Sequence, residues 1–106
     1  MSAEEITSSI ESIENEAEKT LEEARSRANE IILKAKEEAS RILSAEMPLD
    51  EQKRECEQIL NKARGKANQE VEESKKKASE LRTSARKKME EVVERIVKII
   101  TGAKLE

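Results

Sequence analysis

The chain has 106 residues, of which 42% are charged, and it contains no aromatic residue and no histidine. Aromatic side chains usually supply much of a core's buried area, so we do not expect a compact single-chain core. A net charge of −3 gives no overall bias toward nucleic acid, and the lack of histidine removes the commonest general base and metal ligand.

The composition nevertheless favours helix over disorder, because Glu, Lys, Ala, Arg, Leu and Ile dominate and there are only two glycines and one proline. Charge is segregated along the chain: the first quarter is acidic and the third quarter, from Lys75 to Lys88, is basic. Two interpretations stay open: solvated helix faces, or a signal that orients a partner.

The first predicted element is a coiled-coil helix over residues 1–46. Ser2 and Glu5 have the spacing of a capping box, which favours a helix start. An apolar stripe then steps by four, three and four residues, an eleven-residue period, whereas a heptad series from Ile6 meets five polar residues. The predicted partner-helix interface here comprises Ile6, Ile10, Ile13, Ala17, Leu21, Ala24, Ala28, Ile32, Ala35, Ala39 and Leu43.

The second predicted element is a kink or break over residues 47–50, within a region from Ala45 to Asp50. Pro48 lacks a backbone donor and disfavours helical geometry at Met47. A hairpin is the alternative, but no glycine marks a tight reversal, so we favour a kinked rod.

The third predicted element is a second coiled-coil segment over residues 51–88. The eleven-residue stripe returns in a new phase, shifted by about 130° around the helix, with Ser74 and Arg82 as its polar exceptions. Such a repeat has about 3.67 residues per turn and predicts a right-handed supercoil. The predicted interface continues with Cys56, Leu60, Ala63, Ala67, Val71, Ala78, Ala85 and Met89.

A faint internal repeat links the two segments. "LEEARSRANEIILKAKEEAS" from Leu21 is similar to "LNKARGKANQEVEESKKKAS" from Leu60, an offset of 39 residues. Duplication and chance similarity in a low-complexity sequence both remain open as explanations.

The last predicted element, residues 89–106, has a wider and β-branched apolar face. Gly102 stands where a helix C-terminus often ends. This segment is interpreted either as a more hydrophobic end of the same coil or as a docking segment for a globular partner. Its docking residues are Val92, Val93, Ile96, Val97 and Ile100.

The chain lacks the residues that several classes of function require. The lone Cys56 has no histidine partner, and Gly65 and Gly102 do not form a phosphate-binding loop, so we expect no catalytic, cofactor-binding or metal-binding residues. We expect Cys56 to pack in the stripe, with a cross-linking or redox role as the alternative. The basic run has no aromatic residue for base stacking and no broad apolar face for a membrane surface, so we expect no nucleic acid partner.

The sequence also predicts a soluble, cytoplasmic protein. The first twenty residues lack a basic start and an apolar run, which argues against a signal peptide, and the apolar stretch from Val92 to Ile100 is too short to span a bilayer. We therefore expect an all-α protein: a long, kinked or interrupted helix that forms a right-handed coiled coil with a partner.

The acidic helical start, the alanine-rich repeats ("EEARSRANEIILKAKEEAS") and the end "VVERIVKIITG" together resemble the small peripheral-stalk component, known as H or G, of archaeal A-type and V-type rotary ATP synthases. The resemblance extends over essentially the whole chain and consists of patterns rather than invariant residues. Pro48 departs from the continuous coil of that family.

The resemblance implies a non-catalytic stator protein that forms a heterodimer with the larger stalk component, known as E, and resists rotor torque, so that ion transport stays coupled to ATP synthesis or hydrolysis. It implies that the C-terminal segment contacts the catalytic head and that the N-terminal end approaches the membrane part of the stator. The protein would be peripherally associated with the membrane through the complex. The alternatives are a self-associating coiled-coil spacer, which forms homodimers, and an adaptor that uses the basic run.

Overall fold

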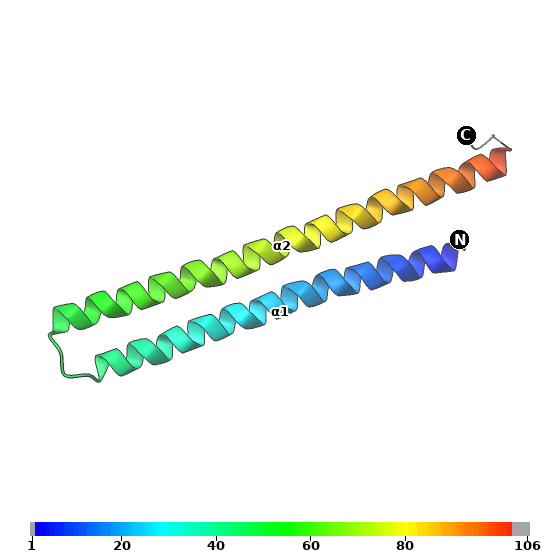
Figure 1. Ribbon diagram of the computed structural model, residues 1–106. Helices are drawn as coiled ribbons and strands as arrows, with labels where there is room; N and C mark the ends of the chain where they lie inside the picture. Colours follow the sequence, from blue (N-terminus) through cyan, green and yellow to red (C-terminus); the bar gives the residue numbers. More distant parts are fainter. Residues whose placement is uncertain (1, 103–106) are drawn as a thin grey trace. The chain divides into compact units, whose positions relative to one another are not determined.

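The structure, a computed structural model, describes residues 2–102 and consists of two long helices without strands in that range. Helix α1 spans Ala3–Leu43 and helix α2 spans Leu49–Thr101 (Figure 1). The predicted all-α class is confirmed. Helix-favouring residues fill both elements, and the only proline lies between them.

Helix α1 begins at the predicted cap. The backbone N–H of Glu5 donates to Ser2 Oγ at 3.1 Å, and the N–H of Ile6 donates to the Ser2 carbonyl at 3.1 Å. These bonds satisfy donors that have no partner inside the first helical turn. Acidic side chains in that turn, Glu4 and Glu5, also suit the positive end of the helix dipole.

The break around Pro48 covers residues 44–48, whereas it was predicted over 47–50. Helix α1 ends at Leu43, three residues before the predicted limit of 46, and α2 begins at Leu49, two residues before the predicted start at 51. Pro48 precedes α2, and its carbonyl accepts the first bond of that helix from Gln52 N–H at 3.0 Å. Proline suits this position because its missing N–H would have no helical partner there.

The chain reverses at this break, so the favoured kinked rod is wrong and the hairpin is correct. Cys56 Sγ lies 3.5 Å from the carbonyl oxygen of Ala39, which places the start of α2 beside the end of α1. No glycine is needed because the turn is five residues long and, among the described residues, only Gly102 has a positive φ. The phase shift between the stripes also disfavours a straight helix, which would point them in different directions.

Helix α2 ends at the predicted glycine. Gly102 has a φ of 72°, and its N–H donates to the Ile99 carbonyl at 3.3 Å. A left-handed residue of this kind stops a helix at little steric cost when it is glycine. Residues 103–106 of the predicted docking segment lie outside the described residues.

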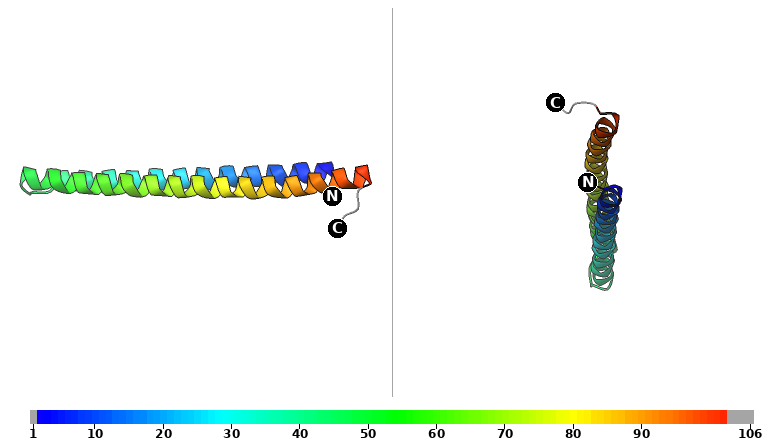
Figure 2. Two further views of the ribbon diagram at one scale, coloured as in Figure 1. Left: turned by 90° about the horizontal axis from the view of Figure 1, so that it is seen from above. Right: turned by 90° about the vertical axis from the view of Figure 1, so that its right-hand side faces the viewer.

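The chain divides into two units. Unit 2 is the hairpin Leu21–Lys75, which contains the end of α1, the turn and the start of α2. Unit 1 combines the described residues up to Thr20 with those from Lys76 onward. Within each unit, one segment of α1 lies antiparallel beside one segment of α2 (Figures 1 and 2). The helix that covers each apolar stripe therefore comes from the same chain, whereas the sequence predicted a separate partner.

Candidate helix-pairing interface

The buried residues are all small. Those in unit 2 are Ala24, Ala28, Ala35, Ala39, Cys56, Ala63, Ala67 and Ser74, and those in unit 1 are Ala17 and Ala78. Nine of these ten were predicted interface residues. The tenth, Ser74, is the polar exception in the second stripe, and a serine is close enough to alanine in size to fit. Small side chains let the two helix backbones approach closely, as alanine-rich interfaces do.

The buried positions follow one spacing in both helices. From Ala17 to Ala39 they recur at steps of seven, four, seven and four residues, and from Cys56 to Ala78 the same steps recur. Each position in α2 is the α1 position plus 39, which is the offset of the sequence repeat. The contact surface is therefore built twice from the same pattern.

Larger apolar residues flank the buried line and are half-buried. Those that were predicted are Ile6, Ile10, Ile13, Leu21, Ile32, Leu60, Val71 and Met89, and the predicted Ala85 is also half-buried. Leu43 does not belong to the interface, because α1 ends at this residue and its side chain is 58% exposed.

Sequence reasoning missed a second flank. Ile31, Ile42, Ile59 and Leu81 are half-buried, and each lies three residues after a buried small residue. The predicted series included the residues that lie four positions after a buried residue. It omitted the residues that lie three positions after one, which are on the other side of the same stripe. The spacing of eleven residues between Ile31 and Ile42 was the available signal.

Unit 2 has an open groove along this second flank. It has a volume of about 390 Å³, and its floor includes Ile31, Ala35, Ile59 and Ala63. Lysines 34, 62 and 66 and Glu38 line its edges. The groove is a gap beside the helix pair rather than an enclosed binding site, so it offers surface for contact with another helix but no pocket for a small substrate.

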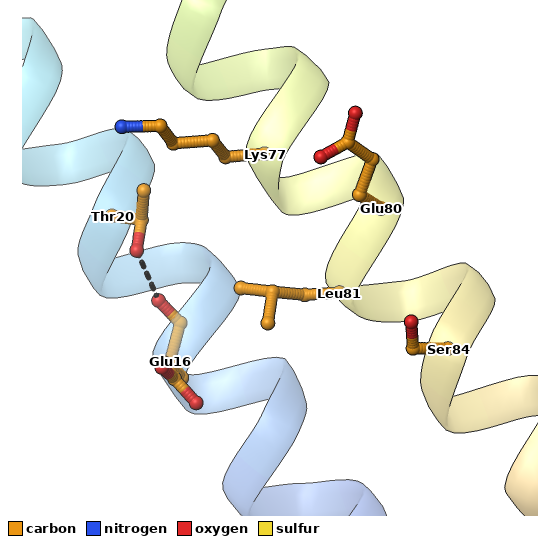
Figure 3. A pocket seen from close by; sticks show the side chains of 6 residues that line it. All are labelled: Glu16, Thr20, Lys77, Glu80, Leu81 and Ser84. Atoms are coloured by element: carbon orange, nitrogen blue, oxygen red, sulfur yellow. Dashed lines mark hydrogen bonds between the residues drawn. The ribbon is translucent and has the colours of Figure 1, made fainter.

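Unit 1 has a comparable groove of about 370 Å³ (Figure 3). Leu81 points from α2 toward α1, and Thr20 Oγ1 donates to the Glu16 carbonyl at 2.9 Å. The remaining lining residues are Lys77, Glu80 and Ser84.

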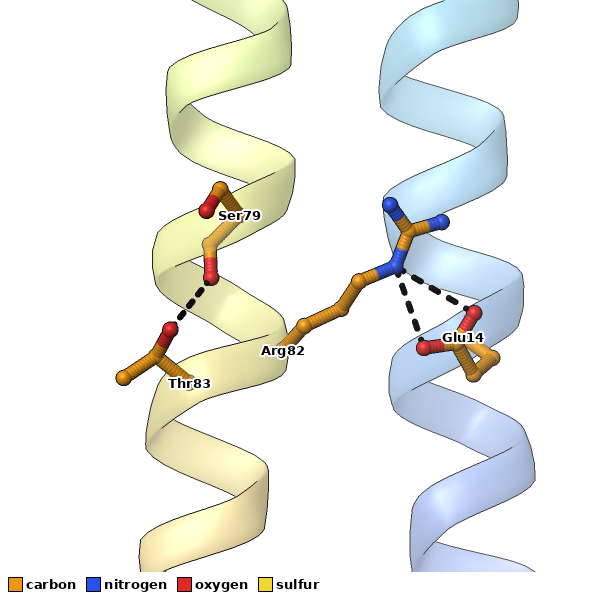
Figure 4. A network of polar contacts seen from close by, with 4 residues as sticks. All are labelled: Glu14, Ser79, Arg82 and Thr83. Carbon is orange, nitrogen blue, oxygen red and sulfur yellow. Dashed lines mark hydrogen bonds and ion pairs between the residues drawn. The ribbon is translucent and has the colours of Figure 1, made fainter.

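Ion pairs join the two helices at the edges of the interface. In unit 2, Arg27 Nε donates to Glu70 Oε2 at 3.0 Å. In unit 1, Arg82 Nε donates to both carboxylate oxygens of Glu14, at 3.1 and 3.3 Å (Figure 4). Unit 1 thus brings the acidic start of the chain beside the basic run, so the segregated charges are complementary within the chain itself.

The turn is held by one side chain that sequence reasoning did not single out. Gln52 Nε2 donates to the Ala45 carbonyl at 2.7 Å and lies 3.4 Å from the Ile42 carbonyl. A glutamine here gives the Ala45 carbonyl, which lies in the turn, a partner from the first turn of α2. Cys56 is free and buried beside Ala39, as expected for a small residue of the stripe.

The predicted docking residues are the least covered part of the stripe. Val93, Val97 and Ile100 are 49%, 51% and 78% exposed, and Val92 and Ile96 are half-buried. In unit 1 Glu14 pairs with Arg82, so Ala3, eleven residues before Glu14, reaches the level of Val93. Helix α2 then continues past the start of α1 (Figure 1), which leaves its last turns without a facing helix.

An apolar cleft adjoins this end of unit 1. It has a volume of about 100 Å³ and is lined mainly by Ile6, Ile10, Ile13, Met89 and Val92. The cleft arises where the buried alanines give way to larger residues that do not close over one another.

Within residues 2–102, no cluster of three or more His, Cys, Asp or Glu side chains is arranged to hold a metal ion. In the same range, neither helix has a stretch both long and apolar enough to cross a membrane. The described residues instead provide a surface on which helices pair.

Comparison with known proteins finds no protein family that matches the chain. No curated protein and no solved structure matches it either.

Proposed function

We propose that the chain is a non-catalytic structural protein that acts by helix pairing, specifically the small stator-stalk component of an A/V-type ATP synthase. The observation that carries helix pairing is the two lines of five small buried residues, one on each helix, at steps of seven and four. The assignment to a stalk rests on the resemblance of the whole chain to that family.

The spacing of the buried residues supports a right-handed coil. Two steps of seven and four span eleven residues, and an eleven-residue period favours a right-handed supercoil. A long interface made of small residues distributes its stability over many shallow contacts. This property suits a strut that bears torque along its length.

Pairing with the larger stalk component is compatible with the hairpin if the partner helix replaces one arm of the chain. The buried line contains no large, fully buried side chain that would lock the two arms together. A partner with a wider apolar face would bury more area against the half-buried flanks, and burial is worth roughly 25 cal/mol per Å². The exposed residues Val93, Val97 and Ile100 would then contact the catalytic head.

The second candidate is a self-associating spacer. It is favoured by the fact that the two stripes already fit each other within one chain. Under this proposal the physiological partner is another copy, and the larger stalk component is not bound.

The test is sedimentation equilibrium of the chain alone and mixed with an equimolar amount of a candidate larger stalk component. The stalk proposal expects a tight one-to-one heterodimer. Two spin labels report whether the arms separate, placed by Glu38→Cys and Lys62→Cys in a Cys56→Ala background, because Glu38 and Lys62 line one groove of unit 2.

A distance that lengthens on binding would show replacement of one arm, and an unchanged distance would show that the larger component packs against the closed hairpin. Failure of that component to bind would sink the stalk proposal. A tight homodimer would then favour the spacer.

A further inference from the structure

The two arms of unit 2 present the same contact surface. Ala24, Ala28 and Ala35 of the first arm correspond, at an offset of 39 residues, to Ala63, Ala67 and Ser74 of the second. An interface whose two sides carry equivalent positions is self-complementary, which is the property of contacts between identical copies. Each arm can therefore recognise the opposite arm regardless of which chain carries it.

The connection between the arms is short, and one side chain of α2 bonds to it. Five residues, 44–48, join the helices, and they include Pro48. Among the described contacts, Gln52 Nε2 is the side-chain group of α2 that bonds to this turn, at the Ala45 carbonyl. Short hinge loops favour the exchange of elements between copies.

Exchange of arms would keep the interface contacts. The buried alanines, the Arg27–Glu70 pair and the contact of Cys56 with Ala39 would form between two chains with the geometry that they have within one. The bond from Gln52 to Ala45 would be lost if residues 44–48 straightened. The balance between the closed and exchanged forms therefore depends on the turn and on protein concentration.

We propose that two copies of this chain exchange arms at residues 44–48 and form an antiparallel dimer through the surface that unit 2 uses in its closed hairpin. The occupant of each opened arm is a second copy. This inference concerns the chain alone and does not depend on the proposed stalk function.

The test is a disulfide trap in the full-length chain. Ala39→Cys places a thiol opposite the native Cys56, whose Sγ lies 3.5 Å from the Ala39 carbonyl oxygen. The protein is equilibrated over a wide range of concentrations, oxidised with copper–phenanthroline and separated without reductant. The closed hairpin gives an intrachain disulfide, and the exchanged dimer gives an interchain disulfide.

The expected result is a covalent dimer whose fraction rises with concentration. Gln52→Ala removes the bond to the turn in both chains and should raise the dimer association constant about thirtyfold, the effect of two net hydrogen bonds. Gln69→Ala is the matched control, because Gln69 bonds only to Glu73 on its own helix and should leave the dimer fraction unchanged. Insertion of two glycines after Glu46 lengthens the turn. The longer turn makes closure within one chain easier and should lower the dimer fraction.

Two results would overturn the proposal. The first is an intrachain disulfide alone at every concentration, with a monomer in sedimentation. The second is a dimer in sedimentation whose disulfides are all intrachain, which would place self-association on another surface, such as the exposed end of α2. Circular dichroism of each variant checks that helix content is retained.

Discussion

Arg82 of α2 donates through Nε to both carboxylate oxygens of Glu14 of α1, at 3.1 and 3.3 Å, from within the apolar stripe of unit 1. Its side chain is 40% exposed and that of Glu14 is 47% exposed, so the pair lies at the edge of the interface. A charged residue is tolerated in the stripe because its head group reaches solvent and a partner while its stem packs against the neighbouring helix.

This pair should contribute modestly to stability. Glu14→Lys alone or Arg82→Glu alone should lower the free energy of unfolding by about 0.5–1 kcal/mol, since exposed ion pairs are worth little. The double exchange should recover most of the loss. Urea unfolding of all four proteins gives the coupling energy, which should shrink as salt is added. A coupling energy of zero at low salt would contradict a stabilising role for the pair.

The close approach of the helices in unit 2 predicts that size matters more than polarity there. Ala28 is buried, so Ala28→Leu should force the arms apart and cost about 1–3 kcal/mol of unfolding free energy. Ser26→Leu is the matched control, because Ser26 is exposed on the same helix and its replacement should be nearly neutral. Thermal unfolding followed by circular dichroism distinguishes them, and equal effects would argue against tight packing at Ala28.

Gly65 offers a stabilising change. It lies exposed within α2, and a Cβ built there meets nothing within 4 Å. Gly65→Ala should therefore stabilise the helix by about 0.5–1 kcal/mol through lower backbone entropy in the unfolded chain. Gly102→Ala should do the opposite, because the φ of 72° there is unfavourable for a residue with a Cβ. Chemical denaturation midpoints measure both.

Because the end of α2 is exposed, we expect substitutions there to change partner binding without changing the stability of the chain. Val97→Glu with Ile100→Glu should change the unfolding free energy by less than about 0.5 kcal/mol, because these side chains are exposed. Under the stalk proposal, the same change should abolish binding of the chain, paired with the larger stalk component, to the catalytic head. A pull-down with the assembled head measures this.

The control for that experiment is Lys87→Glu with Glu90→Lys, which alters exposed residues of the same helix. Retained head binding by the Val97→Glu, Ile100→Glu protein would refute docking through this surface.

The sequence predicted three local features because their signals are local, although the predicted segments 51–88 and 89–106 form the single helix α2. The cap at Ser2, the break at Pro48 and the stop at Gly102 each follow from the backbone chemistry of one or two residues. Nine of the ten buried residues lie in the predicted stripe, because the spacing of residues on one face of a helix depends only on helix geometry. The flank that contains Ile31 and Ile59 was missed because the series was extended in steps of four from each buried position.

What the sequence by itself determined was the helical class, the cap at Ser2, an interruption near Pro48, the stop at Gly102 and most of the small residues that become buried. What only the tertiary structure decided was which helix covers each stripe. The stripes of α1 and α2 have the same spacing, so periodicity cannot distinguish a partner chain from the other half of the same chain. The turn decides between them: five residues beside a suitable glutamine let α2 fold back on α1, which buries the stripes without loss of translational freedom.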